Sequence, residues 1–281
     1  MATTRGLVSR RFELKPTEFR RIRQLIHGWA GIRMDDTKDA LVFSRLAPHL
    51  RRLGLATFAQ YLDVVAKDAT ERDTMVSSLT THETSFFRDA DAFAALRETV
   101  LAALRARRPS TGVQPRHVRV WCAAASDGQE AYSVAMLLHA ELSPEAGWTH
   151  EVLATDISTK CVRHTQAGVY ASAGNVPRAF AAQYLVSRAG GVQVGPILRS
   201  IVRATVHNLV HDALPPGSPF DLILCRNALI YLSAESRSVA QAKLVSALRP
   251  GGYLLLGRAE SVGGWAHVRA TRYLSLGVRQ T

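Results

Sequence analysis

The segment RVWCAAASDGQE, from Arg119 to Glu130, contains the end of an apolar strand, a turn of small residues and the start of a helix. In doubly wound α/β folds a turn of this kind approaches a ligand closely, because small residues keep side chains out of the way. The segment has a single glycine, Gly128, so it lacks the GxGxxG pattern of dinucleotide-binding proteins. A purely structural strand–helix turn would have a similar sequence, so the segment alone does not identify a ligand.

Short apolar runs alternate with helical patterns on either side of this segment, which predicts a mostly parallel, doubly wound sheet. Strands are expected at Val118–Cys122, Val152–Thr155, Phe220–Cys225 and Gly252–Leu256, with helices at Glu130–Leu142 and Val239–Leu248. The stretch Gln193–Val206 has the pattern of short strands, with turns at Gly190-Gly191 and Gly195-Pro196. Such turns do not suit a βαβ repeat, and we expect a small antiparallel insertion there.

Residues 1–90 have the apolar periodicity of helices instead. Helices are expected to begin at Pro16 and to cover 37–53, 57–67 and 70–79. Pro48 is expected to bend or interrupt the second of these, because proline lacks a backbone donor. Lys38, Arg45 and Arg52 are seven residues apart and therefore share one face of that helix.

Composition limits the class of protein. The chain has 281 residues and is 47% apolar, which argues against wholesale disorder. It has no apolar run of about 18 residues and no secretory signal, so we expect a soluble, cytoplasmic protein with no membrane insertion. Its three cysteines, Cys122, Cys161 and Cys225, are too few and too scattered for a disulfide framework or a zinc cluster, and no metal is predicted.

The net charge of +12 is unevenly distributed. Residues 1–52 hold 12 Lys+Arg and 5 Asp+Glu, a net of +7, and the other 229 residues have a net of +5. Such a bias favours an acidic partner, whether nucleic acid, an anionic membrane or an acidic protein surface. Coding bias is an alternative explanation, because 30 of the 35 basic residues are arginine.

Polar residues follow two of the expected strands. Asp156 ends the second strand, where an acidic residue commonly accepts hydrogen bonds from ribose hydroxyls, although such an aspartate can also cap a helix. Arg226 and Asn227 follow the strand Phe220–Cys225, at the end of an open α/β sheet that binds ligands. Together with the small-residue turn, Asp156 indicates an adenosine-type cofactor, either NAD or S-adenosylmethionine.

The order of several motifs resembles the CheR family of chemoreceptor glutamate O-methyltransferases. The similarity runs from about residue 12 to the C-terminus and rests on TTxxTxFFR (Thr80–Arg88), WxAAxSxGxExYS (Trp121–Ser133), ATDIS (Ala154–Ser158), Asn208-Leu209, CRNxxIY (Cys225–Tyr231) and LRPGGYLLLGxxES (Leu248–Ser261). The resemblance implies an all-α N-terminal domain over 1–90 that recognises the receptor. A Rossmann-like class I S-adenosylmethionine methyltransferase domain would follow over 91–281, with a small antiparallel β insertion at about 185–207.

The resemblance also implies roles for individual residues. S-adenosylmethionine would be the cofactor and S-adenosylhomocysteine the product, with the cofactor pocket lined by Thr84, Arg88, Ala123, Glu130, Asp156, Asn208, Leu209, Arg226 and Asn227. Arg88 and Tyr231 would act at the transferred methyl group and the acceptor carboxylate. The implied partner is the cytoplasmic helical domain of chemoreceptors, engaged through Lys38, Arg45 and Arg52, with a receptor C-terminal tail docking on the β insertion. Nucleic acid is not an expected partner.

This sequence departs from the family pattern at a few positions. His82 stands where the family commonly has Asn, and Asp127, Gln129 and Ala131 replace Thr, Glu and Pro. These departures keep open a degenerate domain that binds S-adenosylmethionine without transferring its methyl group. An RNA methyltransferase is a weaker alternative, because the aromatic residues of the N-terminal third fall on apolar stripes and form no stacking platform.

Overall fold

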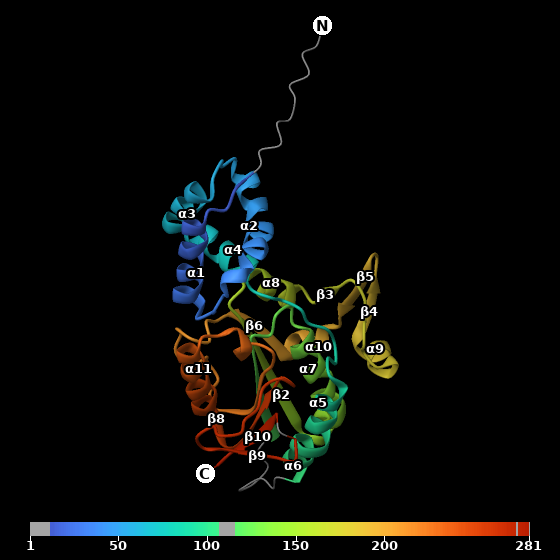
Figure 1. Ribbon diagram of the computed structural model, residues 1–281. Coiled ribbons are helices and arrows are strands. Elements are labelled where there is room, and N and C mark those ends of the chain that lie inside the picture. Colours follow the sequence, from blue (N-terminus) through green and yellow to red (C-terminus); the bar gives the residue numbers. More distant parts are fainter. Residues whose placement is uncertain (1–11, 107–115, 274, 281) are drawn as a thin grey trace. The chain divides into compact units, whose positions relative to one another are not determined.

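The computed structural model describes residues 12–106, 116–273 and 275–280, and the chain divides into two compact units between Thr81 and His82 (Figure 1). The sequence predicts this division at residues 90 and 91. The segment 82–89 belongs to the second unit because it is bonded there: Ser126 Oγ donates to the His82 carbonyl at 2.9 Å, and the Phe87 amide donates to Ser133 Oγ at 2.9 Å.

The first unit is helical, as predicted. It contains α1 (Pro16–Ala30), the 3-10 helix η1 (Asp36–Lys38), α2 (Asp39–Leu53), α3 (Phe58–Lys67) and α4 (Ala69–Leu79). The Glu18 carboxylate accepts from the Lys15 amide at 2.8 Å and from the Ala59 amide at 2.9 Å, so one side chain caps α1 and joins it to α3. The core of the unit is apolar and closed to solvent, with Ile22, Ile26, Leu46, Leu50 and Phe58 at 0% exposure.

Helix α2 continues through Pro48, so the expected interruption is wrong. The residues around the proline lie on the buried face of the helix: Leu46 and Leu50 are fully buried and Ala47 is 2% exposed. Burial of two leucines is worth several kcal/mol, which is comparable to the ~3 kcal/mol that proline costs inside a helix. Packing therefore keeps the helix continuous where local propensity would end it.

The second unit is built on a seven-stranded sheet with the order β6-β2-β1-β7-β8-β10-β9. Its strands are β1 (Arg116–Ala123), β2 (Trp148–Asp156), β6 (Val202–Val206), β7 (Phe220–Cys225), β8 (Leu248–Leu256), β9 (Val268–Ala270) and β10 (Leu276–Arg279). The pairs β6·β2, β2·β1, β1·β7 and β7·β8 are parallel, and β10 pairs antiparallel with both of its neighbours. The predicted doubly wound sheet is confirmed.

Helices cover both faces of this sheet (Figure 1). Alternate residues of β1 enter two different cores, with Val118, Val120 and Cys122 in one and Trp121 and Ala123 in the other. The first core also takes in α5 (Ala90–Ala95), the π-helix η2 (Leu96–Leu101), α6 (Ala102–Ala106), α7 (Gln129–Glu141) and α10 (Pro196–Ile201); α11 (Ala234–Ala247) packs in the second. The fold is a three-layer α/β sandwich. Helix α8 (Thr159–Ala167) follows β2, and the short 3-10 helices are η3 (Pro144–Ala146) and η4 (Leu229–Tyr231).

A small antiparallel sheet is inserted between α8 and β6, but its boundaries differ from the expected 185–207. It has the order β3-β5-β4, with β3 (Val169–Tyr170), β4 (Leu185–Arg188) and β5 (Gly191–Val194), and α9 (Arg178–Tyr184) lies between β3 and β4. The stretch Gln193–Val206 contains the end of β5 and the whole of β6, as the expected short strands, but a helix separates them. Pro196 occupies the first turn of α10, which its ring favours, and residues 202–206 form β6 at the edge of the large sheet.

Candidate active site

The parallel strands β1 and β7 are neighbours, and their connections leave in opposite directions along the sheet. The chain runs from β1 through β2 to β6 on one side, and from β7 to β8 on the other. A ligand crevice is expected at such a switch point, at the carboxyl ends of the strands. Here these ends are Ala123 of β1, Asp156 of β2 and Cys225 of β7, and the residues that follow them carry the site.

The turn after β1 has an unusual backbone. Ala124 and Ser126, neither of them glycine, have positive φ angles of 57° and 52°, a conformation that costs free energy and is found at functional sites. Gly128 has φ 89°, and a Cβ there would lie 2.5 Å from Thr165 Oγ1, so close packing against α8 requires glycine. The turn therefore presents backbone rather than side chains to the crevice.

Asp156 holds this turn in place. Its carboxylate accepts from the Ser126 amide at 2.8 Å and from the Ser158 amide at 2.9 Å, one bond to each oxygen. The residue is 6% exposed, and burial raises the pKa of the Asp156 carboxyl while the two amides oppose that shift. Because a carboxylate oxygen has two lone pairs, each oxygen keeps one acceptor site for a ligand hydroxyl.

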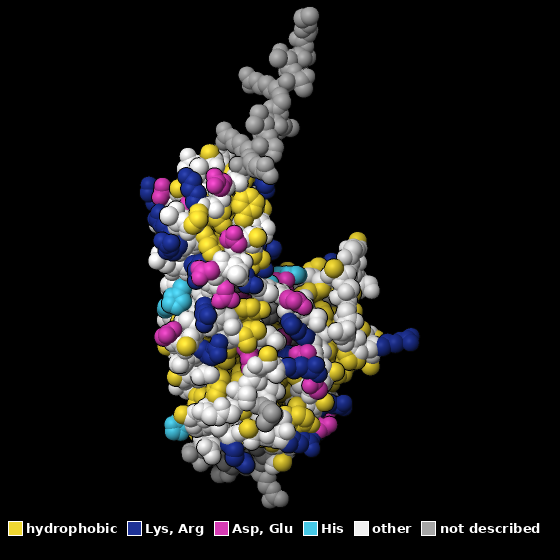
Figure 2. Space-filling view, viewed as in Figure 1, with side chains coloured by type: hydrophobic (Ala, Val, Ile, Leu, Met, Phe, Trp, Pro, Cys, Tyr) yellow, Lys and Arg dark blue, Asp and Glu magenta, His cyan; other side chains and the backbone are white. Residues whose placement is uncertain are grey.

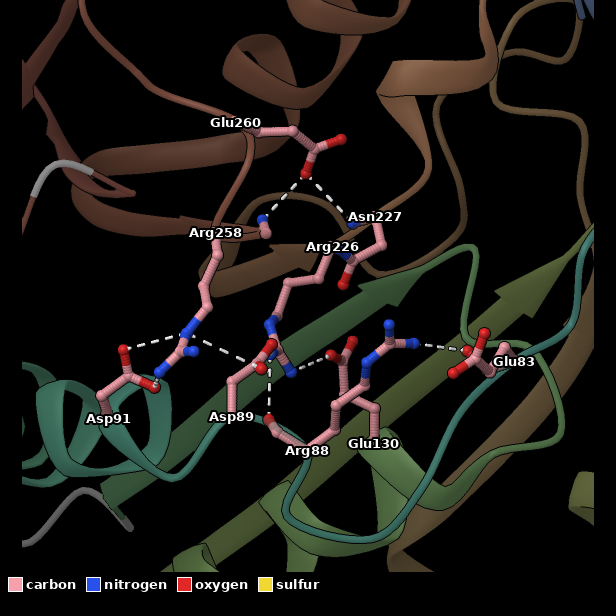
Figure 3. A network of polar contacts seen from close by, with 10 residues as sticks. Glu83, Arg88, Asp89, Asp91, Glu130, Arg226, Asn227, Arg258 and Glu260 are labelled. Carbon is pink, nitrogen blue, oxygen red and sulfur yellow. Dashed lines mark hydrogen bonds and ion pairs between the residues drawn. The ribbon is translucent and has the colours of Figure 1, made fainter.

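Arg226 lies at the centre of a buried charge network (Figure 3). Its side chain is 3% exposed and forms ion pairs with Asp89 at 2.5 Å and with Glu130, in the first turn of α7, at 2.8 Å. It also donates to the Arg88 carbonyl at 2.9 Å. Burial raises the pKa of the Glu130 carboxyl, and Arg226 opposes this shift. Three segments far apart in the sequence thus meet through one guanidinium.

Arg258 extends the network toward solvent. It pairs with Asp91 at 2.7 Å and with Asp89 at 3.7 Å, and its side chain is 65% exposed. A pocket borders this region, lined among others by Asp91, Ala95, Arg226, Leu256 and Tyr273. The network thus reaches the surface beside the carboxyl end of β8.

Arg88 and Tyr231, predicted as the catalytic pair, lie in different local settings. Arg88 Nη1 donates to the Glu83 carbonyl at 2.6 Å, and its guanidinium extends away from Arg226 toward Glu83 in Figure 3. Within the described part of the chain this is the one hydrogen bond of its side chain, so four of its five N–H donors remain for a ligand. Tyr231 ends η4 and is 42% exposed.

Glu260 is a site residue that the sequence analysis missed. Its carboxylate accepts from the amides of Gly257 at 2.8 Å, Asn227 at 3.0 Å and Leu229 at 3.0 Å. Asn227 has φ 57°, a left-handed conformation that asparagine tolerates, and these bonds hold the backbone there. Glu260 therefore fixes the loop that leads from Arg226 to Tyr231. It lies within the quoted motif Leu248–Ser261, but a partnership across about 30 residues has no local sequence pattern.

The remaining predicted cofactor residues lie after β6, at the end of β1 and in the segment before α5. Asn208 follows β6, and its Oδ1 accepts from the amides of Val210 at 3.0 Å and His211 at 3.1 Å, so it shapes a turn. Leu209 packs, partly buried, against the core that contains Trp121. Ala123 is 1% exposed at the end of β1, and Thr84 is half-buried in the segment before α5.

All three cysteines are buried, and two of the residues that depart from the family pattern lie beside side chains of α8. Burial raises the pKa of Cys122, Cys161 and Cys225, which makes all three poor nucleophiles. His82 Nδ1 lies 3.2 Å from Cys161 Sγ, and Asp127 Oδ2 lies 3.3 Å from His164 Nδ1.

Comparisons with known proteins identify the family. The CheR methyltransferase all-alpha domain matches residues 17–80, and the CheR methyltransferase SAM-binding domain matches residues 82–274. The chain belongs to the CheR methyltransferase family. A probable chemotaxis protein methyltransferase of Rhizobium etli is 36% identical, over 86% of this chain and 91% of that protein. Chemotaxis protein methyltransferases of Vibrio parahaemolyticus and Escherichia coli are 35% and 34% identical, over 88% and 90% of this chain and 90% and 87% of theirs.

This CheR-family chain is therefore an S-adenosylmethionine-dependent methyltransferase, and its crevice fits that cofactor. Asp156 retains acceptor sites for hydroxyl groups. Two buried polar atoms of the residues around it, Arg226 Nε and Gln129 Oε1, have no hydrogen-bond partner among the described residues, and a polar ligand in the crevice would satisfy them. In the described ranges no helix is long and apolar enough to cross a membrane.

Proposed function

We propose that this protein transfers the methyl group of S-adenosylmethionine to glutamate side-chain carboxylates of methyl-accepting chemotaxis receptors, giving glutamyl methyl esters. The observation that carries the proposal is the Arg226 network, which holds the Arg88 segment beside the cofactor crevice. Support comes from the relatives, which are named chemotaxis protein methyltransferases and match along most of the chain.

The cofactor would be held by residues on three strand ends. Asp156 accepts the ribose hydroxyls, and Glu130, Arg226 and Asn227 bind the polar groups of the cofactor. Thr84, Ala123, Asn208 and Leu209 line the rest of the pocket. When bound, S-adenosylmethionine supplies a methyl group activated by a positively charged sulfur. Because Arg226 is already paired to two carboxylates, its role is to set the shape and charge of the crevice before any ligand arrives.

A glutamate acceptor needs orientation rather than a base. Its reference pKa is about 4.3, so the side chain is ionised at neutral pH and is already nucleophilic. Arg88 offers a planar pair of donors that suits a carboxylate, and its bond to the Glu83 carbonyl limits the directions in which the guanidinium can point. We assign Arg88 to aligning the carboxylate, which is where most of the rate enhancement arises in such a reaction.

Tyr231 completes the proposed acceptor site. Its backbone amide donates to the Ala228 carbonyl at 3.2 Å, which closes η4, and Glu260 holds the preceding loop. Tyr231 is 42% exposed. We propose that it covers the reacting groups and excludes water when the receptor segment binds.

The helical unit would dock the receptor, and two of the three proposed docking residues also have partners within the unit. Arg45 donates to the Thr80 carbonyl at 2.8 Å and so caps the end of α4, and Arg52 pairs with Glu71 at 2.6 Å. Lys38 is exposed. Residues 12–81 hold 11 Lys+Arg and 9 Asp+Glu, a net of only +2, and Figure 2 shows basic and acidic side chains interspersed over this unit. A basic docking face would therefore cover only a small part of this unit. Substitution of Lys38 tests it most directly, because replacing Arg45 or Arg52 would also remove a contact within the unit.

The small sheet is the proposed site for a receptor tail. Strand β4 lies at its edge, in the order β3-β5-β4, and Val186 on that strand is 51% exposed. An extended peptide can add to an exposed edge through backbone hydrogen bonds. The tail requirement is tested by comparing receptor fragments that have and lack their C-terminal residues.

The experiment that tests the function uses the full chain, S-adenosylmethionine with a labelled methyl group, and membranes that carry the receptors of the same cell. The expected product is a labelled receptor that releases its label as methanol in mild base, because esters hydrolyse there and amines do not. Glutamine replacements at the acceptor glutamates should abolish labelling. Cofactor binding without transfer to any receptor would favour a sensor domain, and label in RNA alone would overturn the proposal.

A further inference from the structure

Three potential metal ligands converge at the edge of the cofactor crevice. His82 Nδ1, a carboxylate oxygen of Asp156 and Cys161 Sγ all lie within 4.8 Å of one another, and the histidine nitrogen is 3.2 Å from the sulfur. Ligand atoms around a tetrahedral zinc ion lie about 3.3–3.6 Å apart, given metal–ligand bonds of about 2.0–2.3 Å. Side-chain adjustments of about 1 Å would bring all three atoms onto one ion.

The surrounding structure already orients these ligands. Two backbone amides hold the Asp156 carboxylate and leave a lone pair on each oxygen. Cys161 lies in the first turn of α8, where its amide bonds to Ser158 Oγ at 3.3 Å. Ser126 Oγ bonds to the His82 carbonyl at 2.9 Å and ties that segment to the turn after β1. Little conformational entropy remains to be lost when a metal binds.

A second carboxylate, that of Asp127, lies beside the three potential ligands. The Asp127 side chain interacts with Cys161, and Asp127 also faces His164 at 3.3 Å. A carboxylate beside the three ligands favours a divalent cation there through its charge. Two departures from the family pattern, His82 and Asp127, therefore lie at this one place, although 45 residues separate them in the sequence.

We propose that His82, Asp156 and Cys161 form a binding site for a thiophilic divalent cation such as Zn²⁺, and that the ion and S-adenosylmethionine exclude one another. One nitrogen, one sulfur and one oxygen donor suit zinc, which accepts three protein ligands and one water. Magnesium and calcium need six or more oxygen ligands and do not fit. Competition follows from Asp156, because the oxygens that would bind the metal are those offered to the ribose. The site would make methyl transfer sensitive to free zinc.

Metal binding is tested on the purified full chain with Co²⁺ as a spectroscopic probe and Zn²⁺ as a titrant. We expect one Co²⁺ per chain with a thiolate-to-cobalt charge-transfer absorption, displaced by one equivalent of Zn²⁺. Cys161→Ser should abolish the absorption, whereas Cys122→Ser and Cys225→Ser should retain it. His82→Asn should weaken Zn²⁺ binding by at least about 100-fold, since loss of an outer-shell partner alone costs about 10–100-fold.

A matched control and a competition experiment complete the test. His267 is exposed and has φ 60°, a conformation that asparagine tolerates, so His267→Asn should leave zinc affinity unchanged. Calorimetry should show the apparent Kd of S-adenosylmethionine rising in proportion to free Zn²⁺ in the wild-type chain and staying constant in His82→Asn. Absence of the charge-transfer absorption, wild-type zinc affinity in His82→Asn, or cofactor affinity unaffected by bound zinc would each overturn the proposal. None of these readouts depends on which acceptor is methylated.

Discussion

Substitution of Glu260 by Gln should loosen the loop that carries Asn227 and Tyr231. The carboxylate accepts three backbone N–H groups at 2.8–3.0 Å, and a hydrogen bond to a charged group contributes about 1.5–3 kcal/mol. Glutamine keeps one oxygen, so at best it retains two of these bonds without charge assistance and turns an NH₂ group toward the third donor. Allowing for water at this half-buried residue, we expect the local opening free energy to fall by about 2 kcal/mol.

Hydrogen exchange measures this effect directly. A loss of about 2 kcal/mol corresponds to roughly 30-fold faster exchange of the Asn227, Leu229 and Gly257 amides. Exchange in the β1 and β7 strands should change little, and kcat for receptor methylation should fall more than S-adenosylmethionine affinity. Glu235→Gln is the control, because it removes an exposed carboxylate from the first turn of α11 in the same unit. Exchange within threefold of wild type at these three amides in folded Glu260→Gln would refute the assignment of Glu260 as the residue that positions the loop.

Three further substitutions test the site and the fold. Arg88→Ala should abolish methyl transfer while S-adenosylmethionine affinity falls much less; near-wild-type receptor methylation would remove Arg88 from the mechanism. Arg226→Met removes the ion-pair partner of Glu130 and leaves Asp89 only its more distant pair with Arg258, so it should lower the free energy of unfolding by about 3–5 kcal/mol at pH 7. Because burial already raises the pKa of Glu130, protonation of this carboxyl should narrow the stability difference between Arg226→Met and wild type as the pH falls, and a difference that does not change with pH would contradict the network. Burial lowers the pKa of His150 to about 4, below its value in the unfolded chain. Its stabilising contribution is therefore present above about pH 6.5 and lost as the pH falls toward 4, by about 2 kcal/mol after allowance for partial exposure. In urea titrations at several pH values, His150→Gln should reduce the fall in the free energy of unfolding between pH 6.5 and 4. The same fall in the variant as in wild type would exclude His150 as its source.

Prediction from sequence succeeded where the pattern is local. β7 has the predicted bounds, β1 and β2 extend the predicted ranges by at most four residues at either end, and α7 is displaced by one residue, because apolar runs and small-residue turns are read over a few neighbouring positions. It failed in part at Gln193–Val206, where the six residues of α10 were expected to be strand and where β6 belongs to the edge of the large sheet rather than to the insertion. It failed also at Pro48, where burial of the surrounding leucines outweighs the preference of proline.

Long-range interactions explain what was missed at the site. Glu130 and Arg226 were both expected at the crevice, since parallel strands bring their carboxyl ends to one edge. That Arg226 also binds Asp89, and that Asp156 supports the turn as well as facing the crevice, follows from contacts between segments 30 to 137 residues apart. Long-range contacts also affect the prediction of a basic docking face. Arg45 and Arg52 were expected on that face, and both have partners within their own unit.

The sequence by itself determined the two-part architecture, the parallel sheet, the cofactor class and the chemical character of the crevice, because these depend on periodicity and on residue types at strand ends. Tertiary structure alone decided which side chains are paired, which are strained and which remain available. It brought His82, Asp156 and Cys161 together and assigned Glu260 to the loop before Tyr231. The physical reason is that hydrogen bonds, ion pairs and metal ligation depend on distances of a few ångströms, which the folded chain sets between residues that have no fixed spacing in the sequence.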